Sequence, residues 1–306
     1  MGSDNRKGVL YAIATASLWG FMAIILKVIT SELPPVTVVW FRFFFAFLVL
    51  GIWTLIFRRS DFAIFRRPPI LLILASIFLG INYIGFITGI KYVSPSSAQV
   101  FIQIGPVGFA LSGILIFREH VNWKHIVGFI LVLAGMGLFY SEQLADLTGA
   151  GEHFTRGMFL VLGGGLSWAI FATLQKVLVK TYRPNQLNLF IYGFCSLVLI
   201  PLASFPSLKV MPAAHWFILV YLGLNTVLAY GSLALAIKFT EATRVSVIIT
   251  LNPLITFITM AILTRMEVAW VGPETFSILA FLGALTVLAG AIVVIRAGWN
   301  KKEGPR

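Results

Sequence analysis

The chain has 306 residues, of which 59% are hydrophobic and only 11% are charged, and its mean hydropathy is +0.95. A soluble domain carries about 25% charged residues, so this composition excludes an ordinary soluble enzyme or binding module. The formal net charge of +12 would by itself suggest a nucleic-acid partner, but the placement of the basic residues, described below, argues against nucleic acid.

The apolar residues come in long runs separated by short polar breaks, which is the pattern of an all-α integral membrane protein. No break is long enough to hold a soluble domain, and the first run is long enough to span rather than to be cleaved as a signal peptide. In chain order we predict ten transmembrane helices, at about 9–30, 36–57, 70–90, 96–117, 123–140, 157–179, 185–205, 213–236, 242–264 and 275–296.

The basic residues in the breaks predict the orientation of these helices. An even number of spans places both termini on one side. With the termini inside, sixteen Lys and Arg residues fall on the inner side and only Lys91, Arg156, Lys209 and Arg265 on the outer side. By the positive-inside rule both termini are therefore predicted to be cytoplasmic. The net positive charge of the chain is then explained by the orientation of its helices in the membrane and by contact with anionic lipid.

The chain reads as two copies of one unit, residues 1–145 and 152–306. At an offset of 149, Trp19 and Lys27 match Trp168 and Lys176, and further matches keep the same order along the chain. Each copy has five spans, and because five is odd the second copy enters the membrane from the opposite side. Two inverted five-helix repeats around a central cavity suit transport by alternating access. The alternative is that duplication only builds a larger bundle.

Two spans carry a polar stripe that ends at a proline near their middle. Ser96, Gln99, Gln103 and Pro106 share one side of a helix, and the repeat places Thr243, Ser246, Thr250 and Pro253 at the matching positions. Lipid disfavours such a face, so we expect both stripes to line the cavity. The prolines are expected to be helix kinks that free the carbonyls of Ile102 and Ile249. The alternative is that small and hydroxyl side chains merely pack helices together.

Aromatic and amide residues inside the spans predict the walls of the cavity. Membrane tryptophans favour the interfaces, yet Trp19 and Trp168 lie near span centres, and Tyr83 and Tyr230 lie inside spans with Asn82 and Asn225 nearby. Aromatic faces with a few amides suit a modest organic solute. For any single residue, filling of the core is an equally good interpretation.

Charge within the spans is scarce. All eleven acidic residues lie in breaks or near span ends, which disfavours a proton relay and a polycationic substrate. Lys27 and Lys176 either snorkel to the headgroups or act as gates that hold a carboxylate on opposite sides of the site. Arg42 is expected to play a structural role, paired with Glu32. The histidines lack metal-ligand spacing and no Walker motif is present, so we expect no metal, no cofactor and no enzymatic activity.

The runs KYVSPSSAQVFIQIGPVGFALSGILIFREHVNWKHIVGFILVLAGMGL and KFTEATRVSVIITLNPLITFITMAILTRMEV resemble the drug/metabolite transporter superfamily, specifically its EamA type. The mid-helix proline, Glu119 after the fourth span and the glycine-rich fifth span carry the resemblance. In the second copy Glu267 is shifted by one residue. The resemblance implies a ten-helix basket in the bacterial inner membrane that exports amino acids or related metabolites, and it is strongest for bacterial exporters of aromatic amino acids.

From these features we expect an exporter of amino acids, including aromatic ones, with a drug or purine-like metabolite exporter as the alternative. The expected partners are a small amino-acid-like solute and the lipid bilayer, and one chain already holds both halves, so a monomer suffices. A membrane enzyme acting on lipids would need a nucleophile or metal cluster at the interface. A scaffold without transport would not need matched polar stripes.

Overall fold

The computed structural model describes residues 3–139, 151–268 and 277–297, and every element within these residues is helical. The first part of the chain forms α1 (Ser3–Glu32), α2 (Pro35–Phe57), η1 (Arg59–Phe65), α3 (Ile70–Gly89), α4 (Pro95–Phe101), α5 (Ile104–Leu115) and α6 (Trp123–Phe139). The second part forms α8 (Glu152–Leu178), α9 (Pro184–Leu199), η3 (Ile200–Leu202), α10 (Phe205–Lys209), α11 (Ala213–Phe239), α12 (Ala242–Ile249), α13 (Asn252–Arg265) and α14 (Ile278–Ala297).

Eight helical segments of the described chain are long and apolar enough to cross a membrane, when α4 with α5 and α12 with α13 are each counted as one segment. Two shorter apolar helices, Trp123–Leu138 and Phe281–Val294, lie where the fifth and tenth spans are predicted. The protein is therefore an all-helical membrane protein, and the count of ten crossings stays a prediction.

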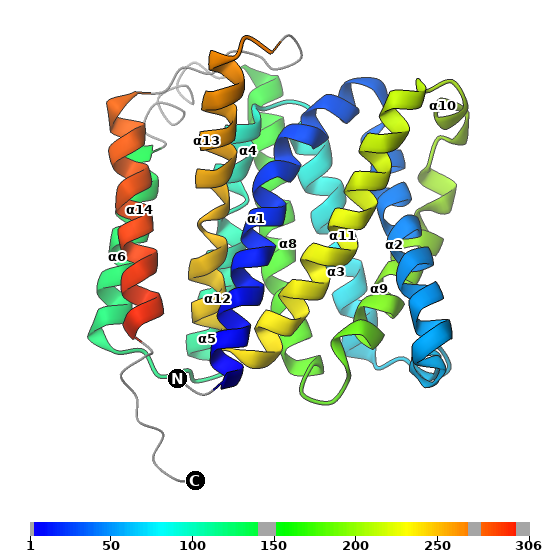
Figure 1. The fold of residues 1–306 in the computed structure, drawn as a ribbon, viewed down its shortest axis with the longest axis horizontal. Coiled ribbons are helices and arrows are strands. Elements are labelled where there is room, and N and C mark those ends of the chain that lie inside the picture. Colours follow the sequence, from blue (N-terminus) through cyan, green and yellow to red (C-terminus); the bar gives the residue numbers. More distant parts are fainter. Residues whose placement is uncertain (1–2, 140–150, 269–276, 298–306) are drawn as a thin grey trace.

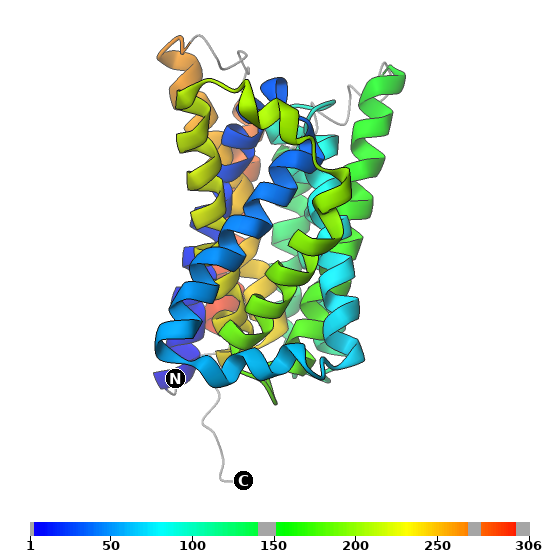
Figure 2. The ribbon, with the colours of Figure 1, turned by 90° about the vertical axis from the view of Figure 1, so that its right-hand side faces the viewer.

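The helices form a bundle whose elements run nearly along one axis (Figure 1). α1 begins and α14 ends at the same end of the bundle, which we call the N end; the opposite end is the far end. η1 lies across the N end between α2 and α3 (Figure 2).

Contacts between helices fix their directions. The Lys27 ammonium, near the end of α1, donates to the carbonyls of Ile90 and Val93, just after α3, so α1 and α3 run the same way. The end of α3 meets the beginning of α8 at Gly89 and Gly157, so α8 runs opposite to α1. Two helix pairs that the predicted repeat relates to each other, α1 with α11 and α8 with α3, are among the most extensive helix contacts in the bundle.

Both predicted kinks are instead breaks between two helices. The turn at Ile102 and Gln103 separates α4 from α5, and a matching turn separates α12 from α13. Pro106 and Pro253 then sit in the first turn of the second helix, where a missing N–H is tolerated because that group has no helical partner. The expectation of a free Ile102 carbonyl is wrong, because this oxygen accepts the Gly105 N–H at 2.9 Å.

The main hydrophobic core lies between α1, α2, α3, α8, α9 and α11. α6 and α14 pack on each other at one side of the bundle (Figure 1), with a small separate core that includes Val132, Val247 and Val287. Gly128 and Gly290 allow this approach, since a Cβ on Gly128 would come within 2.9 Å of the Gly290 carbonyl. The central six helices and the broken helices beside them therefore position the site.

Candidate functional site: a central cavity at the helix breaks

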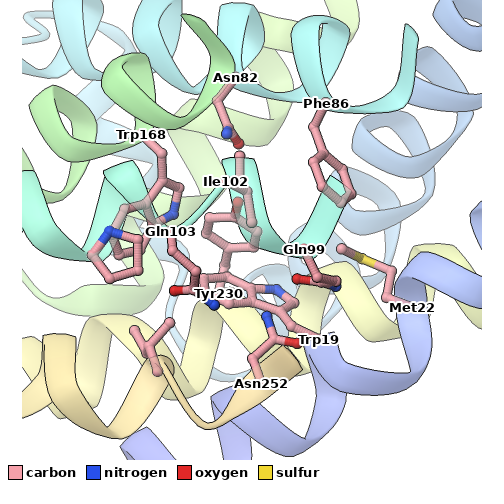
Figure 3. Close-up of a pocket in the computed structure, with 12 residues that line it drawn as sticks. Trp19, Met22, Asn82, Phe86, Gln99, Ile102, Gln103, Trp168, Tyr230 and Asn252 are labelled. Atoms are coloured by element: carbon pink, nitrogen blue, oxygen red, sulfur yellow. The ribbon is translucent and has the colours of Figure 1, made fainter. Parts of the chain in front are cut away.

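A cavity lies beside the break between α4 and α5. Its walls come from α1, α3, α4, α5, α8, α11, the end of α12, the beginning of α13 and the turn before α5 (Figure 3). The lining residues are Trp19, Met22, Asn82, Phe86, Gln99, Ile102, Gln103, Pro106, Trp168, Tyr230, Ile249 and Asn252.

Several buried polar atoms on this wall have no hydrogen-bond partner among the described residues. They are the side-chain oxygens of Gln99 and Asn252, both polar atoms of the Gln103 amide, and the indole N–H groups of Trp19 and Trp168. Figure 3 shows the amides of Gln99, Gln103 and Asn252 gathered around Trp19. An unpaired buried polar group costs about 1–3 kcal/mol, so a bound solute that pairs with them would be stabilised.

Aromatic rings close the cavity toward the N end. The Trp19 ring contacts those of Trp168 and Tyr230, with centroids 5.8 and 5.3 Å apart. Phe171 packs on Tyr230, and Phe109 packs on Trp168, on the N-end side of this cluster. Met22, Phe86 and Gln99 lie on the far-end side. The cavity therefore extends from the aromatic cluster toward the far end.

The break also turns a helix N-terminus toward the cavity. α5 begins directly after Gln103, and Asn252 is the first residue of α13. A helix N-terminus carries a partial positive charge, and half-helices in transporters commonly aim this end at an anionic group of the substrate. The cavity therefore combines unpartnered amides with the beginnings of two helices.

The predicted cavity residues divide into two sets. Trp19, Asn82, Gln99, Gln103, Trp168, Tyr230 and the kink residue Pro106 line the cavity. Tyr83 lies behind Tyr230, with ring centroids 5.6 Å apart. Asn225 lies outside the lining and donates from its amide to the Leu18 carbonyl at 2.8 Å. Pro253 is buried next to Asn252 and is also outside the lining.

Ser246 and Thr250 line a second cavity instead. This space of about 640 Å³ lies between α5, α6 and α12, and its other walls are almost entirely apolar. The Ser246 and Thr250 hydroxyls donate to the carbonyls of Ala242 and Val247 in their own helix. These two hydroxyls therefore already have acceptors, whereas Thr243 of the same stripe donates to the Glu119 carboxylate at 2.9 Å.

Three lining residues were missed in the sequence. Asn252 precedes Pro253 in the middle of a span, and an Asn-Pro pair there is itself a signal of a break with an exposed amide. Met22 lies one helical turn beyond Trp19 and Phe86 one turn beyond Asn82, so helical spacing from the predicted residues would have found both.

Lys176 takes part in an ion pair at the N end. Its ammonium lies 3.3 Å from the Glu119 carboxylate and donates to the Thr240 carbonyl at 2.8 Å. The Glu119 carboxylate also accepts the backbone N–H groups of Ala242 and Thr243, at the beginning of α12. These contacts, which we call the N-end latch, join the segment after α5 to the ends of α8 and α11 and the start of α12.

Lys27 makes related contacts with backbone carbonyls at the far end. Its ammonium donates to the carbonyls of Ile90 and Val93, at 2.9 Å each. By the two repeat offsets, Lys27 and Val93 correspond to Lys176 and Thr240. The shifted acid, Glu267, is exposed. Within the described residues no group of three or more His, Cys, Asp or Glu is placed to hold a metal.

Comparison with known proteins identifies the family. The model of the EamA-like transporter family matches residues 6–141 and 155–296. The uncharacterized inner membrane transporter YhbE of Escherichia coli K12 is 32% identical over 295 residues, covering 93% of this chain and 90% of YhbE. An uncharacterized transporter of Haemophilus influenzae is 30% identical over 288 residues, covering 94% of each chain.

A solved crystal structure shares the fold, with a TM-score of 0.73 at 16% identity over 97% of this chain and 99% of the other. The resemblance drawn from the sequence is thus confirmed at the level of the family. The chain belongs to the EamA-like transporter family and is a membrane transporter.

Proposed function

We propose that this protein exports amino acids, including aromatic ones, and related small metabolites by alternating access. Its two inverted repeats, residues 1–145 and 152–306, would move around the central cavity, which would be open in turn to each side. The opposite directions of α1 and α8 support this arrangement.

The observation that carries the proposal is the combination of aromatic walls and unpartnered amides in one cavity. Trp19, Trp168 and Tyr230 offer ring faces to an apolar or aromatic side chain. Gln99, Gln103 and Asn252 offer amide donors and acceptors that lack partners among the described residues. An amino acid carries both features, a polar head and a side chain of variable size.

Lys27 and Lys176 are proposed as gate residues at the two ends. Each ammonium ties a helix end to a backbone segment near a broken helix, so each cluster must loosen for its end to open. In the present conformation the N-end latch is intact and the cavity lies toward the far end. Export therefore requires the latch to open and the solute to enter past Phe109 and Phe171.

We propose the bacterial inner membrane as the location, with both termini in the cytoplasm. The excess of basic residues in the breaks on the side of the termini supports this orientation. α1 begins and α14 ends at the same end of the bundle (Figure 1), and the relative YhbE is named as an inner membrane transporter.

Flux into reconstituted vesicles tests the proposal. Purified protein would be given labelled Phe, Trp, Thr and Ala, with and without a pH gradient. Faster uptake of Phe and Trp than in protein-free vesicles is the expected result. Vesicles that pass none of the four but pass a purine or a neutral drug would favour the alternative metabolite or drug exporter, and passage of a cationic dye alone would overturn the amino-acid proposal.

A further inference from the structure

Arg42 is a buried cation inside the membrane-spanning part of α2. Only 1% of its surface is exposed, and it lies seven residues, about 10 Å of helix rise, from the beginning of α2. Its Nε donates to the Thr226 hydroxyl at 3.0 Å, and its Nη2 contacts the Met22 sulfur at 2.9 Å and the Tyr83 hydroxyl at 3.4 Å. The guanidinium also lies over the Tyr83 ring, 4.6 Å from its centroid.

No acid neutralises this charge within the described residues. Four of the described acids pair with other bases, namely Asp4, Asp61, Glu119 and Glu241. The other three, Glu32, Glu152 and Glu267, are exposed. The expected pair between Arg42 and Glu32 is therefore absent from the described contacts. Two hydroxyls and a thioether, which is a weak acceptor, are poor replacements for a carboxylate.

A buried charge without a counter-ion is costly, and in membrane proteins such a residue usually marks a substrate or ion site. A purely packing role is filled by apolar residues at lower cost, and the repeat-related position indeed holds Ile191, which is buried. Only one repeat carries the cation. The asymmetry indicates a task that this half performs and the other does not.

Arg42 is separated from the central cavity by a single side chain. Met22, which contacts the guanidinium, also lines the cavity, as does Tyr230, whose ring neighbours Tyr83. Methionine is unbranched and flexible, with three rotatable side-chain bonds. A change of Met22 rotamer would therefore bring a solute in the cavity within reach of the guanidinium without moving a helix.

We propose that Arg42 is the anion-recognising residue of this transporter and that it binds the carboxylate of the solute when Met22 moves aside. The guanidinium matches a carboxylate with two parallel hydrogen bonds. The inference rests on the proposed function and deepens it, because it assigns the solute class as carboxylates, zwitterions included. Amines that lack a carboxylate are disfavoured by the unneutralised positive charge.

Equilibrium binding to purified full-length protein tests this assignment without requiring transport. The probes are 3-phenylpropionate, a carboxylate, and phenethylamine, a cation of similar size, followed by tryptophan fluorescence. We expect the wild-type protein to prefer the carboxylate by about 10- to 100-fold, the range given by one charge-assisted contact. Absence of any such preference in the wild-type protein overturns the inference with no variant needed.

Two substitutions locate the preference at Arg42. Arg42→Met is expected to bring the two affinities within about threefold of each other, whereas Arg42→Lys keeps the charge and retains most of the preference. Arg265→Met removes an exposed cation of the same charge and serves as the matched control. A folded Arg42→Met protein with the wild-type preference contradicts the assignment but leaves amino-acid export intact. Carboxylate binding without amino-acid flux contradicts export but leaves the assignment standing.

Discussion

The two ends of the bundle are held by related lysines but in different ways. At the N end, Lys176 binds both a carbonyl and the Glu119 carboxylate, and the pair is nearly buried, with side chains 12% and 8% exposed. At the far end, Lys27 binds carbonyls from the corresponding backbone segment, and the repeat-related acid Glu267 is exposed.

The two ends differ in the position of the acid, which is shifted by one residue in the turn that follows the broken helix. After α5, Arg118 takes the left-handed conformation (φ 50°) and Glu119 follows it, donating its N–H to Gly113. After α13, the acid Glu267 itself takes that conformation (φ 52°) and is exposed. At the N end the acid of the turn thus pairs with the lysine, whereas the related acid after α13 is exposed, so opening the two ends should meet different barriers.

The largest expected effect comes from Glu119→Gln. The substitution leaves the nearly buried Lys176 ammonium without a counter-ion, which costs about 3–5 kcal/mol. The conformation with a closed N end should therefore lose most of its stability relative to the conformation with an open N end. In a Cys195→Ala background with Thr173→Cys on α8, we expect labelling of the new cysteine to accelerate by about tenfold or more. Glu267→Gln, an exposed change, is the control and should leave labelling unchanged. Equal labelling rates in all three proteins would show that the latch does not hold the N end shut.

A comparison of Lys176→Met with Lys27→Met sharpens the difference between the ends. Lys176→Met leaves a buried carboxylate without its cation, whereas Lys27→Met removes charged hydrogen bonds to carbonyls, worth about 1.5–3 kcal/mol each. We expect the larger fall in melting temperature for Lys176→Met. The double variant Glu119→Gln/Lys176→Met should be more stable than Lys176→Met alone. Equal falls for the two lysines would indicate that the acid adds nothing to the N end.

The two helix breaks offer a further test at the level of flux. Gln103→Leu removes an amide that lines the central cavity, and we expect uptake to fall by about tenfold, consistent with one lost hydrogen bond to the solute. Thr250→Val removes a hydroxyl that is satisfied within its own helix, and flux should stay within about twofold of wild type. Unchanged flux in a folded Gln103→Leu protein would return Gln103 to a packing role.

Much of the site could be read from the sequence because amides and tryptophans in mid-span are conspicuous against an apolar background. Trp19, Gln103 and Trp168 were identified in this way and line the cavity. Ser246 and Thr250 line the second cavity, and residue type does not reveal that their hydroxyls bond to their own helix. The sequence predicts a structural role for Arg42, paired with Glu32, whereas its actual neighbours lie on α1, α3 and α11, far away in the sequence.

The sequence by itself determined that this protein is a helical membrane protein of a transporter family, and it placed the two helix interruptions within a few residues. Hydropathy and the positions of prolines express how each residue interacts with the bilayer or the backbone. They can therefore be interpreted without knowing which other residues lie nearby. Only the tertiary structure decided which interruption opens on the cavity, that Glu119 meets Lys176, and that Arg42 lies one side chain behind the wall. Those outcomes depend on how helices distant in the sequence pack together and on the position of one acid in a turn. The local sequence pattern does not reveal either of these.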